Sequence, residues 1–127
     1  MKILFDVCCP RQLRKFLPGH EVFTAQEMSW RRLQNGNLLA QAQMLFDVMI
    51  STDSNIEYQQ HLPDYDIGLI VLRSKSGKLP ELLTLVPDCL QAIEEIQKGE
   101  CFYIFTDEAW EREQRKGKIK QRWQPQS

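Results

Sequence analysis

The run Ile67–Leu72 constrains the fold of this chain more than any other segment. Its residues, Ile-Gly-Leu-Ile-Val-Leu, include no polar side chain at either set of alternating positions. A strand without apolar–polar alternation is buried on both faces, as in a parallel sheet that helices cover on both sides. The run therefore predicts a central strand of an α/β sheet.

Four shorter runs with the composition of β-strands accompany this segment along the chain. They are Ile3–Phe5, Glu21–Thr24, Asp47–Thr52 and Cys101–Phe105. Because helical patterns separate the runs, we expect mostly parallel, right-handed βαβ units. The sequence thus predicts a single α/β domain, with a mostly parallel sheet of about five strands and helices on both faces.

Three segments between the strands show apolar residues at helical spacing. The first opens after Pro10, the second begins at Asn37, and the third extends from Leu79 to Ile96. Proline lacks an amide hydrogen and clashes with the preceding turn, so Pro87 should kink the third helix or divide it in two. The residues expected to form the buried stripes of the first two helices are Leu13, Phe16 and Leu17, and Leu38, Leu39, Ala42, Leu45 and Phe46.

Composition and charge restrict the classes of function. Of the 127 residues, 16 are basic and 17 acidic, so the net charge of −1 creates no global field that would attract nucleic acid or a membrane. No apolar run approaches the roughly 18 residues of a membrane span, and the amino-terminal strand does not resemble a signal peptide. We expect a cytoplasmic protein.

The four cysteines show neither zinc-ligand pairing nor the spacing of a redox dithiol. In a reducing compartment we expect Cys8, Cys9, Cys89 and Cys101 to act as small buried hydrophobic residues. Cys8 or Cys9 could instead lie close to Asp6 and be reactive there.

The end of the chain differs in composition from the rest. From Asp107 it is first acidic and then basic, with six Arg and Lys residues against Glu113 alone between positions 112 and 122. We expect residues 1–106 to form the domain and residues 107–127 to form a charged tail, which is helical or disordered and could dock on a partner.

Two aspartates follow predicted strands and are the main candidates for a functional site. Asp6 follows Lys2–Phe5, and Asp53 follows Val48–Thr52. Ligands of open parallel sheets bind beyond the carboxyl ends of the strands, so these carboxylates could share one cation. Mg²⁺ prefers oxygen ligands and needs only one or two carboxylates when substrate phosphates complete its shell.

Other interpretations of these residues stay open. Asp53-Ser54-Asn55 is also a good capping sequence, so each aspartate could cap a local turn. In a phosphorylated receiver domain, Asp53 would be the phosphorylated residue at the end of the third strand. Such a domain also needs a pair of acids after the first strand and a lysine after the fifth, whereas this chain has Asp6 alone and no lysine directly after Phe105. Trp30 with Arg31 and Arg32 could stack on a base and hold phosphates, although a tryptophan in such a loop usually anchors it.

Several short strings together resemble a family of short prokaryotic PIN-like proteins, over about residues 1–105. The strings are Met1–Asp6 with Pro10, Leu17–Val22, Gln26–Met28 with Trp30, Asn35-Gly36 with Leu38-Leu39, Phe46–Val48, Thr52-Asp53 with Asn55 and Tyr58–Gln60, and Val71–Arg73.

The resemblance implies a fold, an activity and a set of ligands. PIN-like domains are three-layer sandwiches and metal-dependent nucleases that gather acids at the strand ends. Many are ribonuclease toxins of toxin–antitoxin pairs. For this chain, the resemblance implies that Asp6 and Asp53 bind Mg²⁺ or Mn²⁺ with support from Asn37 and Asn55. It also implies an RNA substrate, an antitoxin protein as a partner, and a homodimeric assembly.

Two departures from the family pattern give a second hypothesis. The family usually has Asp-Glu after the first strand, where this chain has Asp6-Val7. It usually has Asn-Gly-Glu-Leu-Leu at the start of the next helix, where this chain has Asn37 after Gly36. Each change removes an acid. The alternative to a ribonuclease is therefore a catalytically degenerate PIN-like module that binds a partner protein or RNA without cleaving it.

Overall fold

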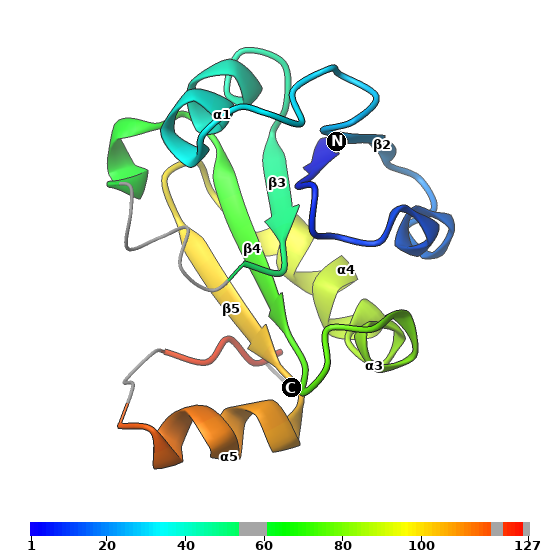
Figure 1. Cartoon of the computed structure of the whole chain (residues 1–127), viewed down its shortest axis with the longest axis vertical. Helices are drawn as coiled ribbons and strands as arrows, with labels where there is room; N and C mark the ends of the chain where they lie inside the picture. Colours follow the sequence, from blue (N-terminus) through cyan, green and yellow to red (C-terminus); the bar gives the residue numbers. More distant parts are fainter. Residues whose placement is uncertain (54–60, 118–120, 126–127) are drawn as a thin grey trace.

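The structure is a computed structural model that describes residues 1–53, 61–117 and 121–125. Five parallel strands form one sheet in the order β2-β1-β3-β4-β5 (Figure 1). All five predicted strands are confirmed, to within a residue or two at their ends. They are β1 (Lys2–Phe5), β2 (Glu21–Thr24), β3 (Val48–Ser51), β4 (Gly68–Arg73) and β5 (Cys101–Phe105).

Helical segments connect the strands and follow the last one. The described segments are the 3₁₀ helices η1 (Arg11–Phe16) and η2 (Leu62–Asp64), and the α-helices α1 (Asn35–Ala42), α3 (Leu79–Leu83), α4 (Val86–Glu95) and α5 (Asp107–Arg115). Pro87 does divide the predicted third helix: it lies in the first turn of α4, where its missing amide hydrogen would have no partner in any case.

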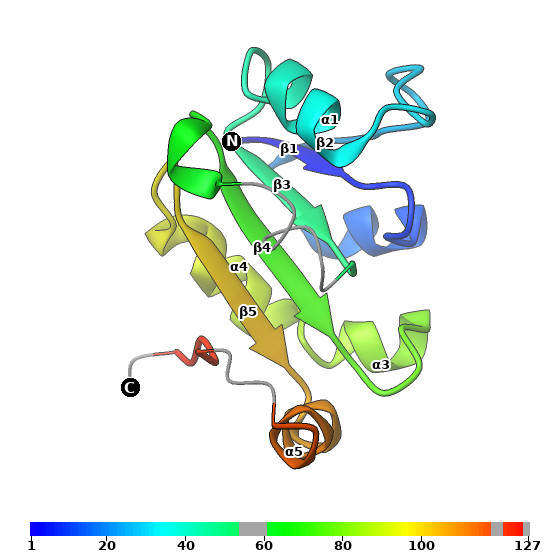
Figure 2. The same ribbon diagram turned by 60° about the vertical axis from the view of Figure 1, so that its left-hand side comes forward.

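Alternating residues of the strands bury two separate cores, one on each face of the sheet. Ile3 and Ile50 face a core formed with η1, α3 and α4. Leu4 and Met49 face a second core formed with α1, η2 and α5. Figure 2 shows α1 and α4 on opposite sides of the strands. The fold is therefore a three-layer α/β sandwich, as predicted.

Two residues expected in the buried stripes are exposed. Phe16 is 43% exposed, because the chain leaves the helical conformation at Leu17, and it is Leu17 that reaches the core. Leu45 is 50% exposed, because α1 ends at Ala42 and helical spacing does not continue to position 45. Among the described residues, no helix has the length and apolar character needed to cross a membrane.

The β2 edge of the sheet is closed by side chains of the same chain. Glu27 accepts a hydrogen bond from the Thr24 amide at 2.8 Å and pairs with Arg14 at the same distance. Arg14 also donates to the Val22 carbonyl at 3.4 Å. The hydrogen bond from the Thr24 backbone, followed by that from Arg14, lowers the pKa of Glu27. These contacts occupy backbone groups of β2 that another strand could otherwise pair with.

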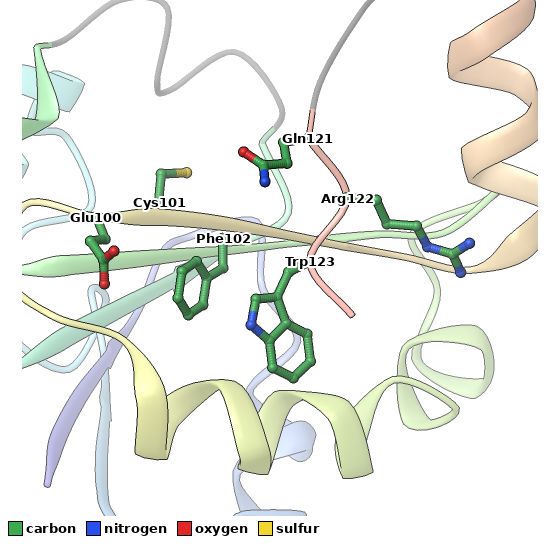
Figure 3. Close-up of a pocket in the computed structure, with 6 residues that line it drawn as sticks. All are labelled: Glu100, Cys101, Phe102, Gln121, Arg122 and Trp123. Carbon is green, nitrogen blue, oxygen red and sulfur yellow. The ribbon is translucent and has the colours of Figure 1, made fainter. Parts of the chain in front are cut away.

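The C-terminal segment covers part of the opposite edge, at β5. The Trp123 amide donates to the Tyr103 carbonyl at 2.7 Å, and the Arg122 guanidinium donates to the Phe105 carbonyl at 2.9 Å. Trp123 stacks on Phe102 with ring centroids 5.9 Å apart, and both rings point towards α4 (Figure 3). The end of the predicted tail thus packs against the domain.

We predict that Trp123→Ala lowers the free energy of unfolding by about 1–2 kcal/mol, because it removes an aromatic pair and a half-buried side chain. Urea denaturation followed by circular dichroism measures the change. Gln124→Ala is the matched control, since its exposed side chain follows Trp123 directly. Equal stability of the two variants would show that the segment does not contribute to the fold.

Candidate functional site

The order of the strands determines where a ligand can bind. The chain leaves β1 for β2 on one side and then returns to β3 on the other side of β1. In sheets with this order, the connections diverge between these two strands and leave a crevice at their carboxyl ends. Asp6 follows β1 there, and its amide donates to the Ile50 carbonyl of β3 at 3.0 Å.

The Asp6 carboxylate is buried and hydrogen-bonded. It is 4% exposed. Its Oδ1 accepts from the Val7 amide at 2.7 Å, and its Oδ2 accepts from the Ser51 hydroxyl at 2.9 Å and from the Cys8 thiol at 3.6 Å. Each carboxylate oxygen can accept two hydrogen bonds, so Oδ1 keeps acceptor capacity for a further ligand.

Ser51 connects the two aspartates. It is completely buried, donates its hydroxyl hydrogen to Asp6, and accepts a hydrogen bond from the Asp53 amide at 3.0 Å. The sequence analysis did not single out Ser51 as a site residue. The available signal was a hydroxyl side chain at the end of an apolar strand, two positions before an aspartate.

One cavity of about 240 Å³ brings several of the predicted site residues together. Asp6, Asp53, Trp30 and Arg31 all contribute to its wall. The described residues that line it are Asp6, Val7, Cys8, Trp30, Arg31, Leu33, Leu38, Thr52 and Asp53.

Two predicted site residues do not line this cavity, and a third lies outside the described residues. Asn37 is exposed in the first turn of α1, and Arg32 is exposed beside the cavity without lining it. Asn55 lies outside the described residues. The resemblance placed Asn37 at the site, and the structure does not put it on the cavity wall.

The donors of this cavity satisfy the minimum for a hard divalent cation. Mg²⁺ commonly binds one or two carboxylates and keeps waters or substrate phosphates in its remaining positions. Two carboxylates line the cavity, and donors from Val7 and Ser51 orient one of them. Among the described residues, no group of three His, Cys, Asp or Glu side chains could hold a metal ion. The described residues of this cavity thus offer two acids to an ion and do not by themselves form a closed metal centre.

The cysteines differ sharply in environment. Cys8 is exposed at the cavity, whereas Cys9 and Cys89 are buried in the core and Cys101 is half-buried. Burial, with a smaller contribution from nearby Asp88, raises the pKa of the Cys89 thiol to about 12. Burial, followed by the neighbouring Cys8, Cys89 and Asp6, raises the pKa of the Cys9 thiol well above its usual value. The expectation of burial thus holds for Cys9 and Cys89, and it is Cys8 that contacts Asp6.

Comparison of the chain with protein-family models, with curated proteins and with solved structures finds no significant match to any of them.

We predict that iodoacetamide at pH 8 alkylates Cys8 well before Cys9 or Cys89. The thiolate is the reactive form, and with a pKa of about 12 only about one Cys89 thiol in 10⁴ is ionised at this pH. Tandem mass spectrometry of the Cys8-Cys9 peptide identifies the modified residue, and urea should make all four thiols react. Rapid labelling of that peptide in a Cys8→Ser variant would contradict the assignment.

Proposed function

We propose that this chain is a PIN-like ribonuclease that depends on Mg²⁺ or Mn²⁺. The observation that carries the proposal is that Asp6 and Asp53 line the same cavity at the crossover between β1 and β3 and are connected through Ser51. Carboxylates at the ends of neighbouring parallel strands are suited to hold a cation against a phosphodiester.

Each residue of the cavity has a role in this proposal. Asp6 and Asp53 supply the ligand oxygens, and Ser51 fixes the direction of the Asp6 carboxylate. A bound divalent cation would activate a water molecule and neutralise charge on the phosphodiester. Trp30 offers a ring on which a base can stack, and Arg31 offers a guanidinium for a phosphate.

We predict that Asp53→Asn and Asp6→Asn each reduce cleavage of single-stranded RNA by at least about 100-fold, because each removes a negative charge that would hold the cation at the phosphodiester. The assay follows a labelled oligoribonucleotide with Mn²⁺ present and with it removed by chelation. Glu95→Gln is the matched control, because it removes one exposed acid from α4, away from the cavity. Circular dichroism verifies that the variants are folded. Cleavage that survives Asp53→Asn rejects the proposed role.

A second candidate is a module of the same kind that binds RNA or a protein partner without cleavage. The observation that favours it is that both oxygens of Asp6 already accept hydrogen bonds, so the buried carboxylate is stable without a cation. The described residues also supply no third acid to this cavity.

Isothermal titration with Mn²⁺ separates the two candidates. The ribonuclease requires heat of binding at millimolar Mn²⁺ that Asp53→Asn removes and Glu95→Gln leaves unchanged. The non-catalytic module requires no such heat and intact RNA at the end of the incubation. A protein that binds Mn²⁺ and cleaves RNA excludes the second candidate.

A further inference from the structure

A second cavity lies beside the first at the carboxyl edge of the sheet. Its volume is about 370 Å³, and residues 73–77, which connect β4 to α3, form most of its wall. Cys8 and Thr52 line both cavities. A ligand that extends beyond the Asp6–Asp53 cavity on this side therefore enters the second one directly.

Arg73 is the best-positioned cation of this wall. Its Nη1 donates to the Thr52 carbonyl at 2.8 Å, and its Nη2 lies 3.9 Å from Oε1 of the buried Glu113. The second distance is too long for a hydrogen bond. These two contacts orient the group, and its Nε is buried, so the remaining hydrogens of Nη1 and Nη2 are the donors left for a ligand. Its side chain is 26% exposed, which is enough to contact a ligand.

The charges of the lining favour an anion. Lys75 adds a second cation, and none of the described residues that line the cavity is acidic. The hydroxyl hydrogens of Thr52 and Ser76 are already donated to the Cys8 carbonyl and to Glu81, so the two cations carry the preference. Acids that contact lining residues without lining the cavity include Asp6, which accepts a hydrogen bond from the Cys8 thiol at 3.6 Å. Glu113 pairs with Arg73, as described above, and Glu81 accepts hydrogen bonds from the Ser76 amide at 2.9 Å and the Ser76 hydroxyl at 2.7 Å.

Glu81 also shows what the loop does to a negative group. Hydrogen bonds from the Ser76 backbone and then from the Ser76 side chain lower the pKa of Glu81, which means that the loop stabilises the charged form of this carboxylate. The loop thus already binds one carboxylate, that of Glu81, which does not line the cavity. The two cations, Arg73 and Lys75, do line it.

We propose that this second cavity binds a phosphate group, namely the phosphodiester of single-stranded RNA that neighbours the one at the Asp6–Asp53 cavity. The choice of RNA rests on the proposed function, whereas the choice of an oxyanion rests on the lining alone. Arg73 binds the phosphate with a guanidinium of fixed orientation, and Lys75 adds a flexible ammonium. The substrate is then an RNA strand that places one phosphate in each cavity, on either side of Cys8 and Thr52. A mononucleotide is too short to occupy both cavities.

The test is an NMR titration of the metal-free, ¹⁵N-labelled protein, in which RNA is not cleaved. Inorganic phosphate is added in one series and a single-stranded oligoribonucleotide of about ten nucleotides in another. We expect both ligands to shift the amide signals of Ser76 and Gly77. Lys75→Gln should weaken binding of each ligand about fivefold, the usual effect of one charge-assisted contact.

Lys78→Gln is the matched control. It removes the same charge from an exposed lysine of the same connection, but Lys78 does not line the cavity. Equal weakening by the two variants, or shifts confined to residues away from 73–77, would overturn the proposal. Shifts with phosphate but none with the oligoribonucleotide reject RNA as the source of the phosphate. Because the titration contains no metal, a failure to cleave RNA in the separate assay leaves its result unchanged.

Discussion

The parallel pairing of β1 with β3 determines where the candidate site lies and how its residues are positioned at the carboxyl edge of this sheet. The chain reaches β2 on one side of β1 and β3 on the other, so the connections diverge and leave the ends of the two central strands accessible. Leu4, Ile50 and their neighbours are completely buried, which fixes the register of the pair. Asp6 and Ser51 therefore take their positions from core packing, and the hydrogen bond between them adds to an alignment that the strands already impose.

The two edges of the sheet are protected by different means. Arg14 and Glu27 occupy backbone groups of β2 with their side chains, whereas the C-terminal segment pairs with β5 through its own backbone at Trp123. Unpaired edges favour aggregation, so both devices limit pairing with other chains. A partner that extended this sheet would first have to displace one of them. Partners of the chain are therefore more easily accommodated on the helical layers or at the carboxyl edge.

Sequence reasoning predicted the fold better than the site. Local rules are enough to interpret the uninterrupted apolar run Ile67–Leu72 and the position of Pro87. The first correctly predicted strand β4, and the second correctly predicted the division of the third helix into α3 and α4. The hydrogen bond of Ser51 with Asp6 depends on how the end of β3 lies beside the end of β1, which no local pattern contains. The contact of Cys8 with Asp6 is local, and the sequence had already offered it as a possibility. The helix α1 begins at Asn35, two residues earlier than expected, so Asn37 lies exposed in its first turn, and its support of a cation stays a prediction.

The surroundings of Asp6 also bear on how a cation would bind. A buried carboxylate costs several kcal/mol unless hydrogen bonds or an opposite charge compensate it. In a site with three or four acids, mutual repulsion makes the cation necessary for stability. Here the Val7 amide and the Ser51 hydroxyl compensate Asp6 without a cation. A cation at this cavity would then obtain less of its binding free energy from the protein and more from the phosphate oxygens of the substrate. Binding of the cation and of the phosphodiester would be coupled, since the phosphodiester supplies ligand oxygens to the cation and the cation supplies positive charge to the phosphodiester.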